Sequence, residues 1–208
     1  MNVHFMAVPA NRMVAVDIPV TVYKILHVTV VVLTTRHDIT EIHCFCFNEQ
    51  ALRILRLFGN TTSHRVIPYV GPEQEYFLVD KELYRQRKDL MFCGRTLLGA
   101  PAPKGQEMED HYFGVLKPRV SAYMHDLDEA LWKLGIPAKT KHNEVAPCQH
   151  ELAPIFDTTN VAIDHNLLTM EMMKKLAPKY GLVCLQHEKP FEGVNGSEIG
   201  RASCRERV

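Results

Sequence analysis

Two glutamates at alternate positions, Glu73 and Glu75, lie in the segment VGPEQEYFLVD, which spans residues 70–80. The aromatic and branched residues that follow them favour a β-strand, and the Gly-Pro pair before them favours a turn. Because side chains alternate between the faces of a strand, both carboxylates point to one side, about 6.5–7 Å apart. Such pairs are common on solvated sheet edges, but two carboxylates on one face also suit a divalent cation, which prefers oxygen ligands.

A second acidic segment strengthens the cation-binding interpretation. The stretch KHNEVAPCQHE, residues 141–151, contains Glu144 and Glu151. Four further polar residues flank them: His142, Asn143, Gln149 and His150. Magnesium binds through one or two carboxylates together with substrate phosphates. Four carboxylates in two separated segments can therefore build a two-cation site for phosphate chemistry.

Periodicity predicts the elements that must position these carboxylates. Apolar residues at helical spacing predict three helices: 49–58, 117–134 and 164–176. Branched and aromatic runs predict four strands: 66–70, 73–79, 138–145 (with Glu144 inside it) and 181–186. The glycines and prolines of residues 94–114 predict a long ordered loop, to which we assign a structural or assembly role.

Four segments, in their order and spacing, resemble the catalytic domain of type III glutamine synthetase: GPEQEYFLVD, GRTLLGAPAPKGQEMEDHYFG, KTKHNEVAPCQHELAPIFDTTN and HEKPFEGVNGS. Several long motifs in register make a chance match very unlikely. The resemblance implies an α+β fold that comprises part of that catalytic domain. Its antiparallel, curved sheet would carry the four glutamates on the concave side and helices on the outer face.

The resemblance also divides the chain into three stretches. Residues 48–197 correspond to the N-terminal part of the catalytic domain, whereas residues 1–47 have no counterpart and stay unplaced. Within that first stretch, Ile25–Leu33 reads as a buried strand. Residues 198–208 resemble the conceptual translation of a sequencing-library adapter, so we expect them to lie outside the fold.

The activity implied by the resemblance is that of a glutamate–ammonia ligase. Such an enzyme forms glutamine from glutamate and ammonia through a γ-glutamyl phosphate intermediate, with ATP as co-substrate and Mg²⁺ or Mn²⁺ as cofactor. Matched residue by residue, Glu75, Glu144 and Glu151 are the expected catalytic residues and ligands of the first metal. Glu73 is expected on the second metal, beside the phosphates.

An Asn-Gly pair near the end of the resembling region is the expected substrate contact. By resemblance, Asn195 and Gly196 hold the glutamate substrate, although the pair by itself would be interpreted as a hairpin turn. The family works as a homo-oligomer, a dodecamer in which a neighbouring subunit's N-terminal domain completes each site. We expect a cytoplasmic enzyme of glutamine biosynthesis and nitrogen metabolism.

Several parts of the family's site have no match in this sequence. They are the second metal's histidine and its further carboxylate, the arginines on the transferring phosphoryl group, and the acidic flap over the intermediate. We therefore expect these 208 residues by themselves to be an inactive fragment. One alternative is a non-catalytic metal-binding or assembly module derived from a truncated homologue. Another is a related ATP-dependent ligase for a different γ-carboxyl or amine.

Composition excludes several other classes of protein. The chain is 46% hydrophobic and 23% charged, which suits an ordinary globular protein of one or two domains. Its formal net charge of zero gives no basic surface for nucleic acid. Charged residues interrupt every apolar run before it reaches the about 18 residues of a membrane span, so we expect no membrane partner. Six cysteines without regular spacing suit a reducing compartment.

Overall fold

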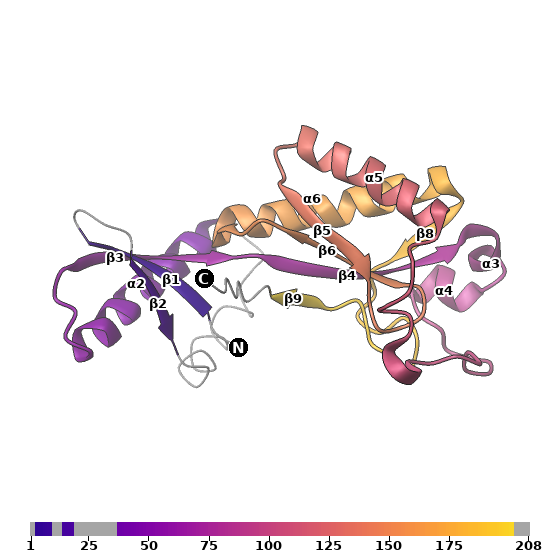
Figure 1. Cartoon of the computed structure of the whole chain (residues 1–208), viewed down its shortest axis with the longest axis horizontal. Helices are drawn as coiled ribbons and strands as arrows, with labels where there is room; N and C mark the ends of the chain where they lie inside the picture. Colours follow the sequence, from indigo (N-terminus) through magenta and orange to yellow (C-terminus); the bar gives the residue numbers. More distant parts are fainter. Residues whose placement is uncertain (1–2, 10–13, 19–36, 202–208) are drawn as a thin grey trace. The chain divides into compact units, whose positions relative to one another are not determined.

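The computed structural model describes residues 3–9, 14–18 and 37–201, with side chains described for residues 46–199. These residues form two compact units (Figure 1). The first comprises the described residues up to Gly71 together with Phe156–Ala162, and the second comprises Pro72–Ile155 and Ile163–Arg201. The strand predicted over Ile25–Leu33 lies outside the described residues. No helix in the described part of the chain combines the length and apolar composition that a membrane span requires.

The described residues of the first unit include helix α2 and a four-stranded antiparallel sheet. The helix is α2 (His37–Leu57), and the sheet order is β2-β1-β3-β7. The strands are β1 (Val3–Pro9), β2 (Val14–Ile18), β3 (Ser63–Val70) and β7 (Asp157–Thr158). The helix predicted to start at residue 49 begins twelve residues earlier, at His37. It ends at Leu57, one residue before the predicted end, and Gly59, two residues further on, adopts φ +81°, a left-handed conformation that favours glycine.

The second unit is built around strand β4 (Pro72–Asp80), which carries the Glu-x-Glu pair. The sheet order is β5-β6-β4-β8, and β9 also pairs with β4. The remaining strands are β5 (Ala138–Asn143), β6 (Gln149–Pro154), β8 (Leu182–Leu185) and β9 (Ile199–Arg201). All these pairings are antiparallel. Strand β6 was not predicted, and β9 lies in the tail that was expected to lie outside the fold.

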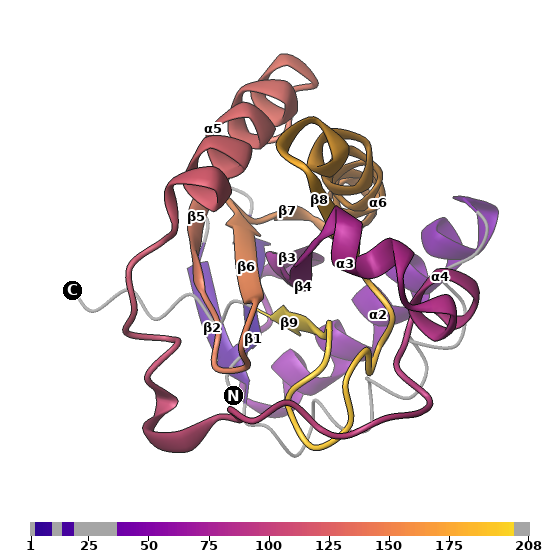
Figure 2. The same cartoon turned by 90° about the vertical axis from the view of Figure 1, so that its right-hand side faces the viewer.

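Helices α5 (Pro118–Lys133) and α6 (Thr159–Leu176) pack on one face of this sheet, as Figure 2 shows. The α6 helix starts five residues before the predicted position, and only its residues from Ile163 on belong to the second unit. Tyr76 and Leu78 of β4 join Leu127 and Leu131 of α5 in a buried core. Burying each such side chain contributes about 1.5–3 kcal/mol to the stability of the fold, so this face of the sheet forms the core. The predicted α+β fold, with helices on one face of an antiparallel sheet, is confirmed.

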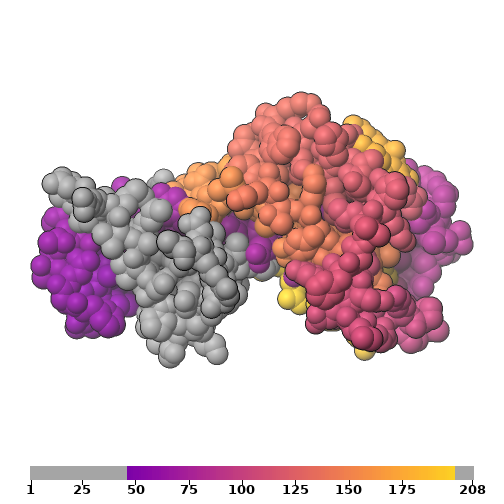
Figure 3. All heavy atoms as spheres, viewed as in Figure 1, coloured from indigo at the N-terminus to yellow at the C-terminus, as the bar shows by residue number. Residues whose placement is uncertain are grey.

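Short helices and loops cover part of the opposite face. Helix α3 (Lys81–Arg85) begins at Asp80, whose carboxylate accepts hydrogen bonds from two backbone N–H groups. It is followed by α4 (Lys88–Cys93), and two 3₁₀ turns lie further along, η1 (Glu107–Glu109) and η2 (Ala177–Tyr180). Apart from η1, residues 94–114 form the predicted irregular loop. In Figure 3 this loop and the residues after it form part of the visible surface of the second unit.

Candidate metal and substrate site

The strand register brings three predicted or flanking residues into one row across the sheet. Glu75 of β4 lies directly opposite Glu151 of β6, and Glu151 lies opposite His142 of β5. Directly opposed residues of antiparallel strands project from the same face with their Cβ atoms about 4.5–5.5 Å apart. Tyr76 and Leu78 point to the helices, so alternation directs Glu73 and Glu75 to the opposite face. We call this face, with Glu73, Glu75, His142, Glu144 and Glu151, the carboxylate face.

Three side chains on the carboxylate face, those of His142, Glu144 and Glu151, lie within direct reach of one another, and this group does not include Glu73 or Glu75. His142 Nε2 is 3.2 Å from Glu151 Oε1, and His142 Nδ1 is 3.6 Å from Glu144 Oε1. One potential ligand atom from each of these three residues lies within 4.8 Å of the others. Glu144 follows the end of β5 rather than lying inside the strand as predicted, because the chain turns there toward Pro147. Its position two residues after His142 still directs it to this group.

The electrostatics of the carboxylate face show an excess of negative charge. Burial, followed by the charges of Glu144 and Glu151, raises the pKa of the Glu75 carboxyl from its ordinary 4.5 to about 7. Burial and the neighbouring carboxylates also raise the pKa values of Glu73 and Glu144. A hydrogen bond with Glu151 is the main cause that raises the pKa of His142 to about 9.

The raised pKa values of the carboxyl groups bear on whether a divalent cation fits the carboxylate face. The imidazolium of His142 leaves the carboxylates short of positive charge, since their pKa values remain raised with His142 in place. Hard oxygen donors converging on a partly buried face are the ligands that Mg²⁺ and Mn²⁺ prefer. The donor set therefore fits a divalent cation. His142 was noted in the sequence only as a flanking residue, because its pairing with Glu151 depends on strand register.

Asn195 and Gly196 lie in the loop after β8, and a glutamine side chain contacts each of them. The Asn195 N–H donates to Gln106 Oε1 at 2.5 Å, and Gln106 Nε2 donates to Asn195 Oδ1 at 3.2 Å. The Gly196 carbonyl accepts from Gln149 Nε2 at 2.8 Å, and that nitrogen also donates to Glu75 Oε2 at 2.5 Å. The turn Asn195–Gly196, which we call the substrate turn after its predicted role, is thus joined to the carboxylate face.

Glycine is required at position 196 because there is no room for a Cβ atom, and not because of its backbone conformation. A Cβ atom at this position would lie 1.9 Å from the carbonyl oxygen of Glu188. Neither Gln106 nor Gln149 was predicted to have a role, because their partners lie 89, 74 and 47 residues away in the sequence. No local pattern could have identified these contacts.

The long loop of residues 94–114 reaches the carboxylate face through backbone contacts. His111 Nδ1 lies 2.6 Å from the carbonyl oxygen of Glu144, and Asn143 Nδ2 donates to the carbonyl oxygen of Gly114 at 3.0 Å. Together with the Gln106 contacts to Asn195, these bonds connect the loop to the segments that carry Glu144 and the substrate turn. The loop supports the candidate site, and its own acidic side chains do not join the group of His142, Glu144 and Glu151.

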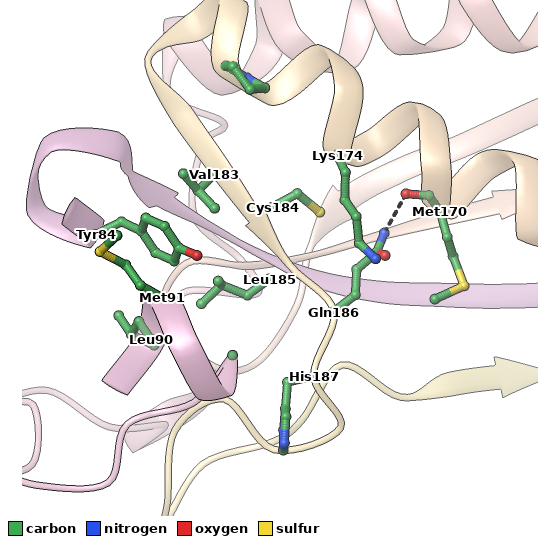
Figure 4. Close-up of a pocket in the computed structure, with 12 residues that line it drawn as sticks. Tyr84, Leu90, Met91, Met170, Lys174, Val183, Cys184, Leu185, Gln186 and His187 are labelled. Atoms are coloured by element: carbon green, nitrogen blue, oxygen red, sulfur yellow. Dashed lines mark hydrogen bonds between the residues drawn. The ribbon is translucent and has the colours of Figure 1, made fainter. Parts of the chain in front are cut away.

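A separate pocket of about 450 Å³ lies beside β8, between α4 and α6 (Figure 4). Its lining includes Leu90, Met91, Lys174 and Leu185. Gln186 crosses it with Nε2 donating to the carbonyl oxygen of Met170 at 2.9 Å, as the dashed line in Figure 4 shows. None of the predicted site residues lines this pocket. The chemistry of the chain gathers on the carboxylate face and not in this cavity.

An α+β domain that carries helices on one face of its sheet and converging carboxylates on the other has the organisation of a metal-dependent enzyme domain. The chain belongs to the glutamine synthetase family, since the family model for the glutamine synthetase catalytic domain matches residues 53–199. The resemblance found in the sequence is therefore confirmed.

Two curated relatives support this assignment. The chain is 69% identical over 150 residues to a glutamine synthetase of Butyrivibrio fibrisolvens, covering 72% of this chain and 21% of that protein. It is 53% identical over 150 residues to the type-3 glutamine synthetase of Dictyostelium discoideum, covering 72% and 20%. A cryo-EM structure of Plasmodium falciparum glutamine synthetase aligns with a TM-score of 0.46 at 20% identity, over 62% of this chain and 28% of that one. The chain spans about a fifth of the length of the two curated relatives.

Proposed function

We propose that this chain is part of a glutamate–ammonia ligase that forms glutamine from glutamate, ammonia and ATP. One observation carries the proposal: Glu75 lies directly opposite Glu151, which groups with Glu144 and His142, in a domain of the glutamine synthetase family. In this reaction a divalent cation, Mg²⁺ or Mn²⁺, neutralises the negative charge that develops as phosphate is transferred.

The residues of the carboxylate face have distinct roles in this proposal. Glu75, Glu144 and Glu151 hold the first cation, while Glu73 contributes to a second one that binds the phosphates of ATP. The raised pKa of Glu75 supports its role as a ligand, because a carboxyl that is costly to ionise alone gains most from a cation. His142 pairs with Glu151 and so holds that carboxylate in place.

The substrate turn supplies the groups for glutamate. Asn195 Oδ1 accepts a hydrogen bond from Gln106 Nε2. The side-chain Nδ2 of Asn195 has no hydrogen-bond partner among the residues that the structure describes. This nitrogen can donate to an acceptor on the substrate, such as a carboxylate. The missing Cβ of Gly196 lets the backbone pack closely there.

Assembly and activity of the whole protein form the second part of the proposal. We propose a cytoplasmic homo-oligomer in which other subunits complete each site. The 208 residues by themselves would not turn over, which is supported by their match to about a fifth of each relative's length. Glutamine formed by the purified chain from glutamate, ammonia and ATP would refute this part. The non-catalytic metal-binding module remains the alternative, because it would use the same carboxylates.

The direct test of the site is titration of Mn²⁺ into the purified chain by calorimetry. Wild type should bind and Glu75→Ala should lose at least about tenfold in affinity, since it removes a direct ligand. Glu192→Ala is the matched control, because Glu192 is an exposed glutamate in the same unit and its removal should leave binding unchanged. Equal affinities in wild type and Glu75→Ala would contradict the assignment.

A further inference from the structure

Gln149 is a wholly buried polar side chain at the start of β6, two residues before Glu151. A buried amide is costly unless its polar atoms are hydrogen-bonded. Gln149 makes three such bonds. Its Oε1 accepts from the Ala146 N–H at 3.0 Å, and its Nε2 donates to Glu75 Oε2 at 2.5 Å and to the Gly196 carbonyl at 2.8 Å.

Only one orientation of the Gln149 amide satisfies all three partners. The Ala146 N–H can only donate, so the oxygen of the amide must face it. The Gly196 carbonyl and an ionised Glu75 can only accept, so both hydrogens of Nε2 are used on them. Rotation of the amide by 180° would oppose donor to donor and acceptor to acceptors. The amide is therefore locked by its surroundings.

The turn before β6 brings Gln149 to this position. The Gln149 N–H donates to the Ala146 carbonyl at 3.0 Å, which closes a four-residue turn. Within the turn Cys148 adopts φ +65°, a conformation that non-glycine residues rarely take. Opposite the turn, β4 places Phe77 against Gln149, so the glutamine side chain extends along the same face as Glu75.

The two acceptors of Nε2 belong to the two halves of the candidate site. Glu75 is a proposed cation ligand, and Gly196 belongs to the substrate turn. Gln149 holds Glu75 Oε2 at 2.5 Å and so fixes the position of the carboxylate that would bind a cation. A shift of the Glu75 carboxylate on cation binding would act directly on the nitrogen that holds the Gly196 carbonyl.

We infer that Gln149 is a positioning residue that ties Glu75 to the substrate turn, so that cation binding and the conformation of Asn195–Gly196 are coupled. The inference rests on the proposed function, because it takes Glu75 as a metal ligand and the turn as a substrate contact. Residues that orient metal ligands typically change metal affinity about 10–100-fold when replaced. Coupling between two sites is reciprocal, so the turn must in addition respond to the cation.

The first measurement compares Mn²⁺ affinity in Gln149→Met and in a matched control. Methionine keeps the length of the side chain but removes both donors, so affinity should fall by about tenfold or more. Ser197→Ala is the control, because the buried Ser197 hydroxyl donates to the Leu185 carbonyl at 3.2 Å and anchors the same loop without contacting Glu75. It should leave affinity unchanged. Wild-type affinity in Gln149→Met, or an equal loss in Ser197→Ala, overturns the inference.

The second measurement is amide hydrogen exchange in the substrate turn with and without Mn²⁺. In wild type, saturating Mn²⁺ should slow exchange over residues 195–197 by at least about fivefold, the lower end of typical coupling between sites. In Gln149→Met the cation should no longer slow it. If Gln149→Met does not fold, Gln149→Leu replaces it, because leucine also removes both donors and leaves the proposed cation ligands unchanged. Exchange that Mn²⁺ leaves unchanged in wild type overturns the coupling.

The two proposals fail in different ways. A wild-type chain that binds no Mn²⁺ removes the metal site of the proposed function, and the coupling falls with it. A wild-type chain that binds Mn²⁺ equally well with and without Gln149 leaves the proposed function intact and overturns only the role of Gln149.

Discussion

Replacing Glu75 with glutamine should stabilise the metal-free protein at alkaline pH. The folded-state pKa of Glu75 is about 7, above its ordinary 4.5, so folding favours the protonated carboxyl. This contribution to stability is fully present below pH 4.5 and is lost as the pH rises through 7. The rise corresponds to about 3 kcal/mol at 1.36 kcal/mol per pKa unit. Because the carboxyl is half exposed, solvent screening reduces the expected cost to about 1 kcal/mol.

Glu75→Gln removes this cost while keeping an oxygen that accepts from Gln149. With a chelator present, the free energy of unfolding of the variant should exceed that of wild type by about 1 kcal/mol at pH 8.5 and match it at pH 5. Urea unfolding followed by the fluorescence of Trp132, the single tryptophan, reports on the second unit. Glu192→Gln, an exposed glutamate of the same unit, should show no pH-dependent difference from wild type.

Added Mn²⁺ should reverse the order of stability. A cation at 100 times its dissociation constant stabilises the folded state by about 2.7 kcal/mol, and Glu75→Gln should lose most of that gain. If the variant gains no stability over wild type between pH 5 and pH 8.5 without metal, burial and the neighbouring carboxylates do not raise the pKa of Glu75. If Mn²⁺ stabilises both proteins equally, Glu75 is not a ligand.

Three further changes test the structure around the site. Gly196→Ala should destabilise the protein by about 2 kcal/mol or more in urea unfolding, because the new Cβ would lie 1.9 Å from the Glu188 carbonyl oxygen; a loss below about 0.5 kcal/mol would contradict this packing. Cys148→Gly should raise the melting temperature, with a gain of about 0.5 kcal/mol, since glycine relieves the positive φ of 65° while losing only an exposed thiol; a lower melting temperature would argue against strain in the turn. Burial lowers the pKa of His150 from 6.5 to about 3, so the contribution of His150 to folding stability is fully present above pH 6.5 and is lost as the pH falls toward 3. His150→Gln should therefore reduce the loss of stability at acid pH. An unchanged stability profile would exclude this histidine as the cause.

Local patterns in the sequence predicted those helices and strands whose signal is carried by neighbouring residues. The apolar spacing between Val120 and Leu131 predicted α5, and these residues are buried in the core. The alternation of Glu73, Glu75 and Tyr76 predicted a strand with both glutamates on one face, which β4 confirms. These predictions needed only the period of a helix or a strand, which is a property of neighbouring residues.

Strand β6 was missed because its sequence lacks a strong strand signal. The segment from Gln149 to Pro154 contains two polar residues, a glutamate and a proline among its six positions. It forms a strand because β4 and β5 supply hydrogen-bonding partners on both sides. Pairing of this kind is settled between segments far apart in the chain, so intrinsic preference does not reveal it.

The sequence by itself identified the family and predicted the residues to which we assign the chemistry, four glutamates and an Asn-Gly pair. The tertiary structure alone decided how they meet. It set Glu151 against Glu75, paired His142 with Glu151, and used Gln149 to join the carboxylate face to the substrate turn. The physical reason is that side-chain type and periodicity are properties of neighbouring residues, whereas strand register and buried hydrogen bonds join separate segments of the chain, whose contact only the folded chain creates.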